Sequence, residues 1–367
     1  MNTVTPRVFI AATRQNDGKT TVSLGLMAAL QKFYPRIGFI KPVGQRFVEI
    51  DEQKIDEDTV LMDQVYRLNC PLVSMSPIAV EPDFTRKYLQ SANYDALVKK
   101  IQKAFDRVAW EKDFVLCEGS GHAGVGSVFD LSNARVARLL RAKVIIVTQG
   151  GIGKPIDEVT LNHALLDRED VEVVGVILNK VTPDKLDYVS EFAKRGLKRK
   201  GLHLLGVLPH QPILTRPSLD GIREELRAEV LNRTSELSNN VSEVLVGAMS
   251  IPVALKRFNP GALLISSADR EDMIMAAATA AAAAKDALAG IILADGTPPS
   301  AQVLSAIEKM PFPVLLASQD SYAVASKVHD LTVKTRANET GKISVIRDLI
   351  AKYVDVERIV KAVRSTE

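Results

Sequence analysis

Short apolar runs rich in Val, Ile and Leu recur six times along the first 210 residues. They occupy residues 7–13, 36–43, 113–119, 143–148, 173–181 and 204–209. Segments with helical periodicity separate the runs, the first of them at about 20–34. Apolar runs without polar alternation are typical of strands that are covered on both faces. Their alternation with helices predicts an α/β fold with a doubly wound, mainly parallel sheet.

A second series of apolar runs follows and predicts a second, smaller α/β domain. These runs occupy residues 243–249, 262–268, 290–295 and 313–318. A predicted helix and a Ser/Asn-rich connection occupy 218–240, and we place the domain boundary near 212–217. We therefore expect a first domain at 1–211 and a second at 212–367, which ends with a helix predicted at 343–363.

The composition is that of a water-soluble globular protein, with 25% charged and 46% apolar residues in a chain of 367. Its net charge of +3 is too small to indicate a nucleic-acid partner. The stretch 276–290 is mostly alanine but contains two charged residues, which favours a packed helix over a membrane span. We therefore expect neither a nucleic acid nor a membrane among its partners.

Cysteine usage and the N-terminus both favour a cytoplasmic location. Two cysteines, Cys70 and Cys117, are too few for a disulfide framework, which fits a reducing compartment. The N-terminus lacks a charged segment followed by a long apolar one, so we expect no secretory signal. Because Cys117 lies inside an apolar run, we do not expect it to act as a nucleophile.

Residues 12–23 read ATRQNDGKTTVS and contain the end of a phosphate-binding loop. In such a loop, backbone N–H groups surround phosphate oxygens at the start of a helix. Gly18 permits close approach, Lys19 can reach the β- and γ-phosphates, and Thr20 can bind Mg²⁺. A predicted strand precedes the loop and a predicted helix follows it, which is the context that the motif requires. Thr13 stands where the motif has its first glycine.

A lysine and a carboxylate follow the next two predicted strands of the first domain. Lys41 lies at the end of the run 36–43, and Glu118 lies at the end of the run 113–119. Ligands of open α/β sheets bind at the carboxyl ends of the strands, so both side chains should lie beside the loop. Either residue alone is usually a solvated side chain. Together with Gly18, Lys19 and Thr20 they indicate a site for an anion and a metal ion.

Taken in order, these motifs resemble dethiobiotin synthetase and its relatives among the phosphate-loop ATP-dependent ligases. The shared pattern covers about residues 6–211 and reads T-x-x-x-x-G-K-T, K-P-V, an acidic segment before Leu-Met, E-G-x-G, a strand ending in Asn, and G-x-[LI]-P. In that family the loop is G-T-x-x-x-x-G-K-T. Thr13 therefore matches the family threonine, and Ala12 stands in for the glycine.

The resemblance implies ATP and Mg²⁺ as cofactors. It implies that Thr20, Asp58 and Glu118 bind the metal ion. Asp56 and Glu57 are rival ligands in the same acidic segment, which is otherwise an ordinary solvated helix start.

The resemblance also implies how the nucleotide is held. Lys19 and Lys41 would flank the transferred phosphoryl group as catalytic residues. Asn179 would contact the base, and residues 207–209 would line the base pocket. The full set implied to contact the nucleotide is Thr13, Asn16, Asp17, Gly18, Lys19, Thr20, Thr21, Asn179 and Pro209.

The loops around the acceptor site depart from the family pattern. Dethiobiotin synthetases read K-P-V-A-S-G and E-G-A-G-G where this chain has KPVGQR and EGSGH. Gln45, Arg46 and His122 alter the pocket, so we expect an unknown small-molecule acceptor rather than the biotin-pathway substrate. His122 is either an acid or base toward that acceptor or an ordinary loop residue. Arg14 clamps a phosphate, reaches across a dimer interface or is merely exposed.

Closer matches to three segments, GFIKPVGQR, IDEDTVLM and SPIAVEPDFTRKYL, occur in the N-terminal region of long bacterial phosphate acetyltransferases and in stand-alone phosphotransacetylase-like proteins. The resembling families form dimers across the acceptor site, so a homodimer is expected. The acetyltransferase domain that follows in the long proteins has no counterpart before Glu367. We therefore expect no acetyl transfer by this chain.

Residues 246–273 resemble the DRTGG domain that follows in such proteins. Asp269 and Arg270 match its first two letters, but Glu271, Asp272 and Met273 replace the remaining three. Asp269 is either the N-cap of a helix or part of a ligand site.

Three functions remain open from the sequence. The first is an Mg²⁺-ATP-dependent enzyme that phosphorylates a carboxylate or carbamate, or that hydrolyses ATP as a switch. The second is a nucleotide-sensing regulatory protein without turnover, linked to acetate or acyl-phosphate metabolism. The third, a true dethiobiotin synthetase, is disfavoured by the altered acceptor loops.

Overall fold

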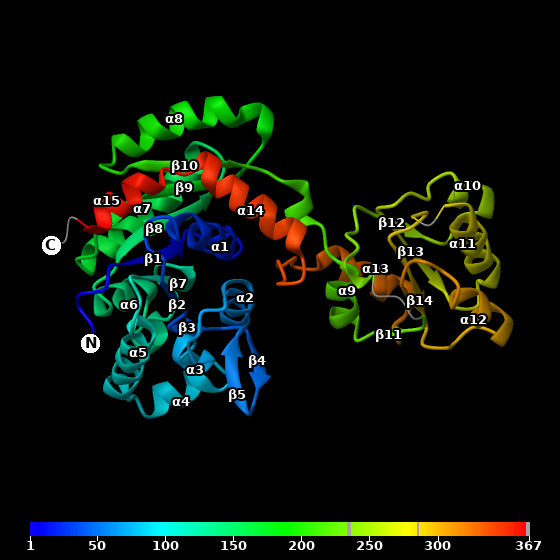
Figure 1. The fold of residues 1–367 in the computed structure, drawn as a ribbon, viewed down its shortest axis with the longest axis horizontal. Coiled ribbons are helices and arrows are strands. Elements are labelled where there is room, and N and C mark those ends of the chain that lie inside the picture. Colours follow the sequence, from blue (N-terminus) through cyan, green and yellow to red (C-terminus); the bar gives the residue numbers. More distant parts are fainter. Residues whose placement is uncertain (233–235, 285, 365–367) are drawn as a thin grey trace. The chain divides into compact units, whose positions relative to one another are not determined.

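The computed structural model describes residues 1–232, 236–284 and 286–364. It contains two compact units, which are drawn in Figure 1. The first unit comprises Met1–His210 together with the segment from Thr340 onward, and the second comprises Gln211–Glu339.

A six-stranded parallel sheet lies at the centre of the first unit, in the order β10-β9-β8-β1-β7-β2. Its strands are β1 (Arg7–Ala12), β2 (Ile37–Ile40), β7 (Phe114–His122), β8 (Lys143–Gln149), β9 (Val173–Val181) and β10 (Leu204–Pro209). Side chains along these strands are buried almost without alternation. The doubly wound, mainly parallel sheet expected from the apolar runs is confirmed.

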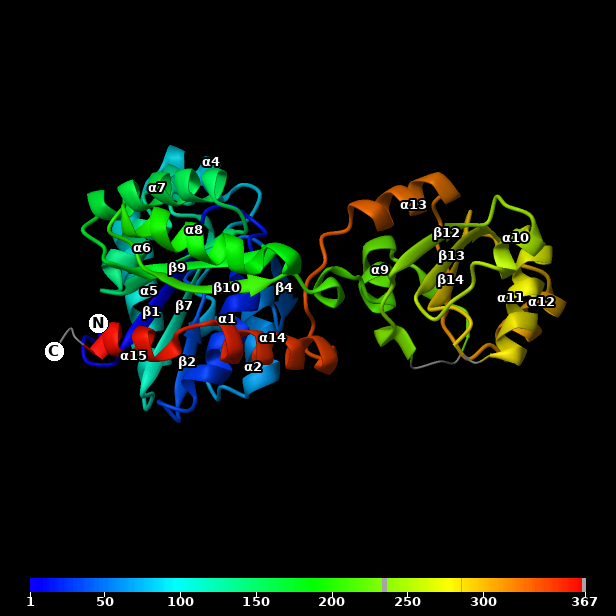
Figure 2. The ribbon, with the colours of Figure 1, turned by 90° about the horizontal axis from the view of Figure 1, so that it is seen from above.

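Helices cover both faces of this sheet. The helices of the first unit are α1 (Lys19–Leu30), α2 (Glu57–Tyr66), α3 (Leu72–Met75), α4 (Phe84–Gln90), α5 (Tyr94–Ala109), α6 (Asn133–Leu139), α7 (Gly153–Arg168), α8 (Leu186–Lys198), α14 (Thr340–Tyr353) and α15 (Val356–Arg364). Figure 2 shows α7 and α8 on one side of the sheet and α14 and α15 on the other. The first helix is four residues shorter at its end than the expected 20–34, since it stops at Leu30.

Short elements between β2 and β7 complete the first unit. The strands β3 (Val43–Gly44) and β6 (Ile78–Ala79) pair in parallel, and β4 (Phe47–Ile50) and β5 (Gln53–Asp56) form an antiparallel hairpin. Short 3-10 helices occur in both units, at η1 (Ser127–Phe129), η2 (Pro183–Lys185), η3 (Pro212–Thr215) and η4 (Glu236–Ser238).

The C-terminal helices pack on the first unit. The second domain, which we expected to cover 212–367, therefore ends before Thr340. Gly25 on α1 permits this packing, because an added Cβ would lie 2.2 Å from Ile350 Cγ1 and 3.0 Å from the Ile346 carbonyl oxygen. The predicted helix at 343–363 is also two helices rather than one. Helical periodicity indicates an apolar face but does not say which surface covers it.

The second unit is the smaller α/β domain that the sequence predicts. Its sheet has the order β11-β15-β14-β13-β12, and only β11 is antiparallel to its neighbour. The strands are β11 (Glu229–Val230), β12 (Glu243–Val246), β13 (Ala262–Ser267), β14 (Gly290–Ala294) and β15 (Val314–Leu316). The helices are α9 (Leu219–Leu226), α10 (Ile251–Leu255), α11 (Glu271–Ala283), α12 (Ala301–Ile307) and α13 (Ser321–Asp330).

Two apolar clusters form the core of the second unit, one on each face of its sheet. The first includes side chains from α10, α11 and α12, and the second includes side chains from α9 and α13. The helix predicted at 276–290 ends earlier, at Ala283, and β14 begins at Gly290. The predicted connection after α9 contains β11, and its residues 233–235, like residue 285, lie outside the described residues.

Across the described ranges, no helix combines the length and the apolar character that crossing a bilayer requires.

Candidate functional site

The loop between β1 and α1 has the backbone geometry of a phosphate loop. Gly18 has a φ of +102°, a conformation that glycine adopts without strain. A Cβ at this position would also lie 2.1 Å from Asn179 Nδ2, so there is no room for a side chain. Asn16, with a φ of +65°, provides a second left-handed residue in the same turn.

Three consecutive N–H groups lie where the loop enters α1. The Thr13 N–H, at the start of the loop, donates to the Val147 carbonyl across 2.9 Å. Within the part of the chain that the structure describes, the N–H groups of Gly18, Lys19 and Thr20 donate to no acceptor. Free N–H groups at a helix N-terminus, where the helix dipole is positive, bind phosphate and other anions.

The buried carboxylate of Asp17 accepts hydrogen bonds from within the loop. Asp17 is 0% exposed, and its Oδ2 accepts hydrogen bonds from Thr13 Oγ1 and from the Arg14 N–H, both at 2.7 Å. Thr13 Oγ1 also lies 2.8 Å from Thr148 Oγ1 at the end of β8. The side chains of Thr13 and Asp17 therefore shape the loop, and their contact with a nucleotide stays a prediction.

Arg14, in the loop, forms an ion pair with Glu158 of α7. Its Nε lies 3.1 Å from Glu158 Oε2 and 3.8 Å from Asp17 Oδ1. The guanidinium is thus partnered within its own chain, and its role toward a phosphate or a second subunit stays a prediction.

Two residues at the end of β9 hold the backbone of the loop. Asn179 Nδ2 donates to the Asp17 carbonyl across 2.9 Å, and Lys180 Nζ donates to the Asn16 carbonyl across 2.8 Å. The amide that we expected at the base therefore contacts the loop. Pro209, at the end of the neighbouring strand β10, lies at the same edge of the sheet. Contact of both residues with a base stays a prediction.

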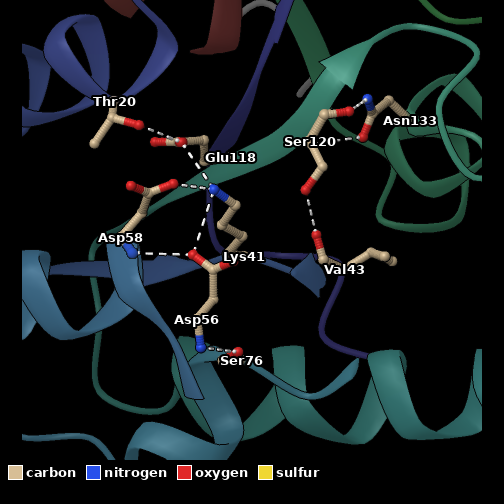
Figure 3. Close-up of polar contacts among 9 residues, drawn as sticks. All are labelled: Thr20, Lys41, Val43, Asp56, Asp58, Ser76, Glu118, Ser120 and Asn133. Atoms are coloured by element: carbon tan, nitrogen blue, oxygen red, sulfur yellow. Dashed lines mark hydrogen bonds and ion pairs between the residues drawn. The ribbon is translucent and has the colours of Figure 1, made fainter. Parts of the chain in front are cut away.

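Lys41 lies among three buried carboxylates (Figure 3). Its Nζ is 3.4 Å from Asp56 Oδ1, 3.4 Å from Glu118 Oε1 and in direct contact with Asp58 Oδ2. The Lys41 side chain is itself buried, and the residue follows β2 at the carboxyl edge of the sheet. The lysine and the carboxylates expected at this edge therefore meet there.

The start of α2 positions both aspartates. Asp56 ends β5 and is the N-cap of α2, where its Oδ1 accepts a hydrogen bond from the Asp58 N–H across 3.0 Å. The Asp56 N–H in turn donates to Ser76 Oγ across 3.0 Å. Of the three rival acidic residues, Asp56 and Asp58 contact Lys41, whereas Glu57 is not among its ion-pair partners.

Glu118 joins this cluster to the loop. Its Oε1 accepts a hydrogen bond from Thr20 Oγ1 across 3.0 Å and also faces Lys41. Its Oε2 is buried and makes no hydrogen bond of good geometry, although the Ser23 hydroxyl is near enough to stabilise the charge. Of the residues expected to bind a metal ion, Asp58 and Glu118 thus lie at the Lys41 ammonium, and Thr20 is hydrogen-bonded to Glu118.

The charges of the cluster shift the pKa values of its members. Burial disfavours the Lys41 ammonium, but Asp58, Glu118 and Asp56 outweigh it and raise the pKa of Lys41. Burial raises the pKa of Glu118, and Lys41 offsets part of that rise. Burial lowers the pKa of Lys19, which Glu118 partly offsets. Three carboxylates thus face the Lys41 ammonium, and Lys19 is close enough to Glu118 and Asp58 to interact with their charges.

The described residues contain no group of three or more His, Cys, Asp or Glu side chains already arranged to hold a metal ion. In the cluster of Lys41, Asp56, Asp58 and Glu118, the ammonium lies between the carboxylates. A metal ion would have to displace it.

The two loops of the expected acceptor site are joined by hydrogen bonds. Ser120 Oγ donates to the Val43 carbonyl across 2.6 Å. Asn133 Nδ2 donates to the carbonyls of Ser120 and His122, each at 2.6 Å. His122 Nδ1 accepts a hydrogen bond from the Gly124 N–H across 3.2 Å, and the residue is exposed.

Gln45 and Arg46 are exposed and lead into the β4–β5 hairpin. The Arg46 carbonyl accepts a hydrogen bond from the Glu57 N–H at the start of α2. Gln45, Arg46 and His122 thus have exposed side chains, and their contact with an acceptor stays a prediction.

Several supporting residues could not be identified from the sequence. They are Ser120, Asn133, Thr148, Glu158 and Lys180. Thr148 and Lys180 had a weak signal, because each ends a predicted strand at the edge where ligands bind. Asn133 and Glu158 had none, because each acts across a long stretch of chain.

In the second unit, α11 begins at Glu271 with Arg270 at the N-cap position. The expectation that Asp269 caps this helix is therefore wrong. Arg270 contacts both oxygens of Asp272, at 2.8 and 3.0 Å, and donates to the Gly247 carbonyl. A role of Asp269 in ligand binding stays a prediction.

Residues 6–218 match the model of a family described as an AAA domain, and residues 221–331 match that of the DRTGG domain. The first match covers the sheet and the loop, and the second lies within the second unit. Together they confirm the P-loop domain followed by a DRTGG domain that the sequence predicts.

The chain is similar to two curated phosphate acetyltransferases. It is 26% identical over 366 residues to the one from Pseudomonas aeruginosa and 28% identical over 361 residues to the one from Deinococcus radiodurans. The alignments cover 95% of this chain, but 51% and 50% of those proteins. The chain thus spans about half the length of the curated relatives it matches.

Two solved structures show likenesses of fold. The MinD cell division protein of Aquifex aeolicus aligns at a TM-score of 0.36 and 15% identity, over 57% of this chain and 84% of that one. The CBS and DRTGG domains of the regulatory region of Clostridium perfringens pyrophosphatase align at 0.28 and 18%, over 44% of this chain and 78% of that one.

Proposed function

The chain belongs to the AAA domain family, in its P-loop, dethiobiotin synthetase-like form, and from this premise we propose that its first unit binds ATP together with Mg²⁺. One observation carries the proposal: the N–H groups of Gly18, Lys19 and Thr20 have no acceptor among the described residues. They lie at the N-terminus of α1, where the Lys19 side chain adds a positive charge. This combination suits the phosphate groups of a nucleotide.

The residues behind the loop fit a magnesium ion. Mg²⁺ prefers oxygen ligands, and Thr20, Asp58 and Glu118 would supply a hydroxyl and two carboxylates. The buried Glu118 Oε2, which makes no good hydrogen bond, supports a ligand on this side of the cluster. When bound, the metal ion neutralises negative charge on the phosphate groups.

The chemistry that suits this site is phosphoryl transfer from ATP to a carboxylate, to a carbamate or to water. An acceptor oxygen forms a bond to the γ-phosphorus while the bond to the bridging oxygen breaks, and ADP leaves. Lys19 and Lys41 stabilise the charge on the transferred group, and the loop N–H groups orient it. The acceptor would contact the exposed Gln45, Arg46 and His122.

A nucleotide-sensing protein without turnover is the second candidate. The Lys41 ion pairs favour it, because three carboxylates already hold the ammonium group that phosphoryl transfer would use. The chain is similar to phosphate acetyltransferases over about half of their length, which suggests that such a sensor acts on acyl-phosphate metabolism. Either candidate would act in the cytoplasm and as a homodimer. Light scattering of the purified protein tests the dimer.

Phosphate release distinguishes the two candidates. The purified chain is incubated with Mg²⁺-ATP, and binding is measured in parallel by calorimetry. Lys32→Ala is the matched control for Lys19→Ala, because Lys32 is an exposed lysine just beyond α1. Release that Lys19→Ala abolishes and Lys32→Ala preserves supports the enzyme. Binding without release supports the sensor, and the absence of binding contradicts both.

A true dethiobiotin synthetase is tested separately by rescue of a biotin auxotroph. We expect no rescue, because Gln45, Arg46 and His122 replace the residues of the family's acceptor loops.

A further inference from the structure

We propose that Lys41 is an internal cation that excludes divalent metal from Asp56, Asp58 and Glu118 until nucleotide phosphates draw its ammonium away. The inference rests on the proposed nucleotide site and concerns its regulation. Metal and nucleotide would then bind this protein together, and the metal alone would bind weakly.

The ammonium group of Lys41 occupies the position of a cation among the carboxylates. A lysine ammonium has three N–H donors and no acceptor. Three carboxylates face the Lys41 Nζ, at 3.4 Å for Asp56 and Glu118 and in direct contact for Asp58. Three carboxylates therefore surround the ammonium, which donates to Asp58 and Glu118 and stands where a bound cation would be.

The three carboxylates are buried, and a buried charge without a partner destabilises the protein. The residues Asp56, Asp58 and Glu118 are 2%, 9% and 0% exposed, so water compensates little of their charge. Removing one partner of a buried ion pair leaves an uncompensated charge and is strongly destabilising. A cation must therefore remain in the cluster in every state of the site, and the chain supplies one itself.

A metal ion and the Lys41 ammonium exclude each other from the cluster. Mg²⁺ binds oxygen ligands at about 2.0 to 2.1 Å and prefers octahedral geometry, which requires the space between the carboxylates. The Lys41 ammonium fills that space and carries a charge of the same sign. The metal ion and the ammonium group cannot share the same oxygens, so one must leave before the other binds.

A phosphate bound at the loop would give the Lys41 ammonium a new anionic partner. Glu118 Oε1 lies 3.4 Å from Lys41 Nζ and 3.0 Å from Thr20 Oγ1, so a single carboxylate oxygen separates the lysine from the loop. A phosphate on the free N–H groups of the loop would offer Lys41 new anionic oxygens close by. The ammonium can move to the phosphate as the metal ion enters the cluster, so that each cation keeps anionic partners.

Coupling of this kind is reciprocal and is measured as a change in affinity. The test is calorimetric titration of the full chain with Mn²⁺ in the absence of nucleotide. Lys41→Met removes the ammonium but keeps a long apolar side chain. We expect this variant to bind Mn²⁺ at least about tenfold more tightly than the natural chain, within the range of typical coupling energies.

Two control variants isolate the position of the charge. Lys19→Met removes the neighbouring buried lysine, which is not an ion-pair partner of Asp56 or Asp58, and Lys32→Met removes an exposed lysine. Lys32→Met should leave the Mn²⁺ affinity unchanged, and Lys19→Met should raise it less than Lys41→Met does. An equal gain for Lys19→Met and Lys41→Met would overturn the proposal, because it would show a general effect of net charge.

Thermal unfolding provides a second readout that does not depend on activity. Millimolar Mg²⁺ without nucleotide should raise the melting temperature of Lys41→Met by several degrees and that of the natural chain by much less. If Lys41→Met does not fold, Lys41→Gln is refolded with and without Mg²⁺. Refolding that requires Mg²⁺ supports the proposal, and refolding that is indifferent to Mg²⁺ contradicts it.

The failure of this inference can be separated from that of the proposed function. If the natural chain binds ATP but Lys41→Met gains no affinity for Mn²⁺, the cation exchange is wrong and the nucleotide site stands. If Lys41→Met gains Mn²⁺ affinity but no variant binds ATP, the exclusion of metal by Lys41 stands, and its release by a nucleotide is wrong.

Discussion

The side-chain amide of Asn179 donates a hydrogen bond to the Asp17 carbonyl across 2.9 Å, which fastens the end of β9 to the loop before α1. The same nitrogen lies 2.1 Å from the place of a Cβ on Gly18. The loop, the strand end and the helix start are therefore packed without space for one additional carbon.

Gly18→Ala should disrupt this loop for two reasons. The φ of +102° is strained for alanine, and the methyl group would collide with Asn179. We expect a loss of about 1 to 3 kcal/mol in the free energy of unfolding, the usual cost of such strain. Binding of a fluorescent ATP analogue should fall in parallel. Gly153→Ala is the control, because nothing lies within 4 Å of its added Cβ, and it should lower neither quantity.

Asn179→Ala should remove part of the penalty of Gly18→Ala. By itself it deletes one hydrogen bond to the loop, which costs about 1 kcal/mol. In the double variant the methyl group added at Gly18 no longer meets the Asn179 amide, so only the backbone strain remains. A double-mutant cycle by chemical denaturation measures this coupling. Strictly additive effects would contradict the contact between the two residues.

The packing of α14 on α1 can be tested with two matched substitutions. Gly25→Ala and Gly341→Ala each add one methyl group to a helix, and each gains helix propensity of about 1 kcal/mol. The methyl group at Gly25 meets Ile350 at 2.2 Å, whereas nothing lies within 4 Å at Gly341. We expect Gly25→Ala to destabilise by about 1 to 3 kcal/mol through overpacking.

Gly341→Ala should be neutral or stabilising, and chemical denaturation compares the two variants. Equal stability would show that the C-terminal helices do not pack on Gly25 of α1.

The thiol of Cys117 should be unreactive in the folded protein. Burial raises its pKa to about 12, whereas an unfolded cysteine ionises near pH 8.5. The folded state therefore keeps a proton that the unfolded state loses. The stability from this group is complete below about pH 8.5 and declines as the pH rises toward 12.

Alkylation with iodoacetamide at pH 8, followed by mass spectrometry, tests this prediction. Cys70 is only partly buried and serves as the internal comparison, although burial also raises the pKa of its thiol. Labelling of Cys117 should require denaturant. Modification of Cys117 in the native protein at the rate of Cys70 would contradict its burial.

Asn232 should be essential to the stability of the second unit. Its Nδ2 donates to the carbonyls of Met310 and Phe312, at 3.3 and 2.8 Å, and its Oδ1 accepts from the Val314 N–H. Asn232→Asp replaces the donor with an oxygen that faces two carbonyls. We expect a loss of roughly 1 to 3 kcal/mol, the cost of an unsatisfied buried group, measured by thermal unfolding. A smaller loss than for Asn232→Ala would contradict this account.

The parallel sheet and the phosphate loop could be predicted because their signals are local. Continuous apolar runs indicate strands covered on both faces, and a glycine and a lysine at fixed spacing indicate how a loop enters a helix. The meeting of Lys41 and Glu118 was also predictable. Each residue ends a strand of one parallel sheet, and the carboxyl ends of such strands share an edge.

The partners of individual side chains were not predictable. Asp56 and Asp58 were rivals in one acidic segment, and only the turn from β5 into α2 brings both to Lys41. The contact of Asn179 with a base stays a prediction, but its hydrogen bond to the Asp17 carbonyl was not foreseen, because it depends on how the end of β9 lies beside the loop. Hydrogen bonds and ion pairs depend on distances of a few tenths of an ångström, and spacing along the chain does not specify these.

The sequence by itself determined the kinds of element, their order and the edge of the sheet at which the polar residues gather, because periodicity and spacing act over short stretches of chain. Only the tertiary structure decided what covers α14 and α15 and which cation neutralises the buried carboxylates. Burial of an apolar face is non-directional, so any complementary surface can satisfy it. Here the absence of a side chain at Gly25 creates that surface on the first unit.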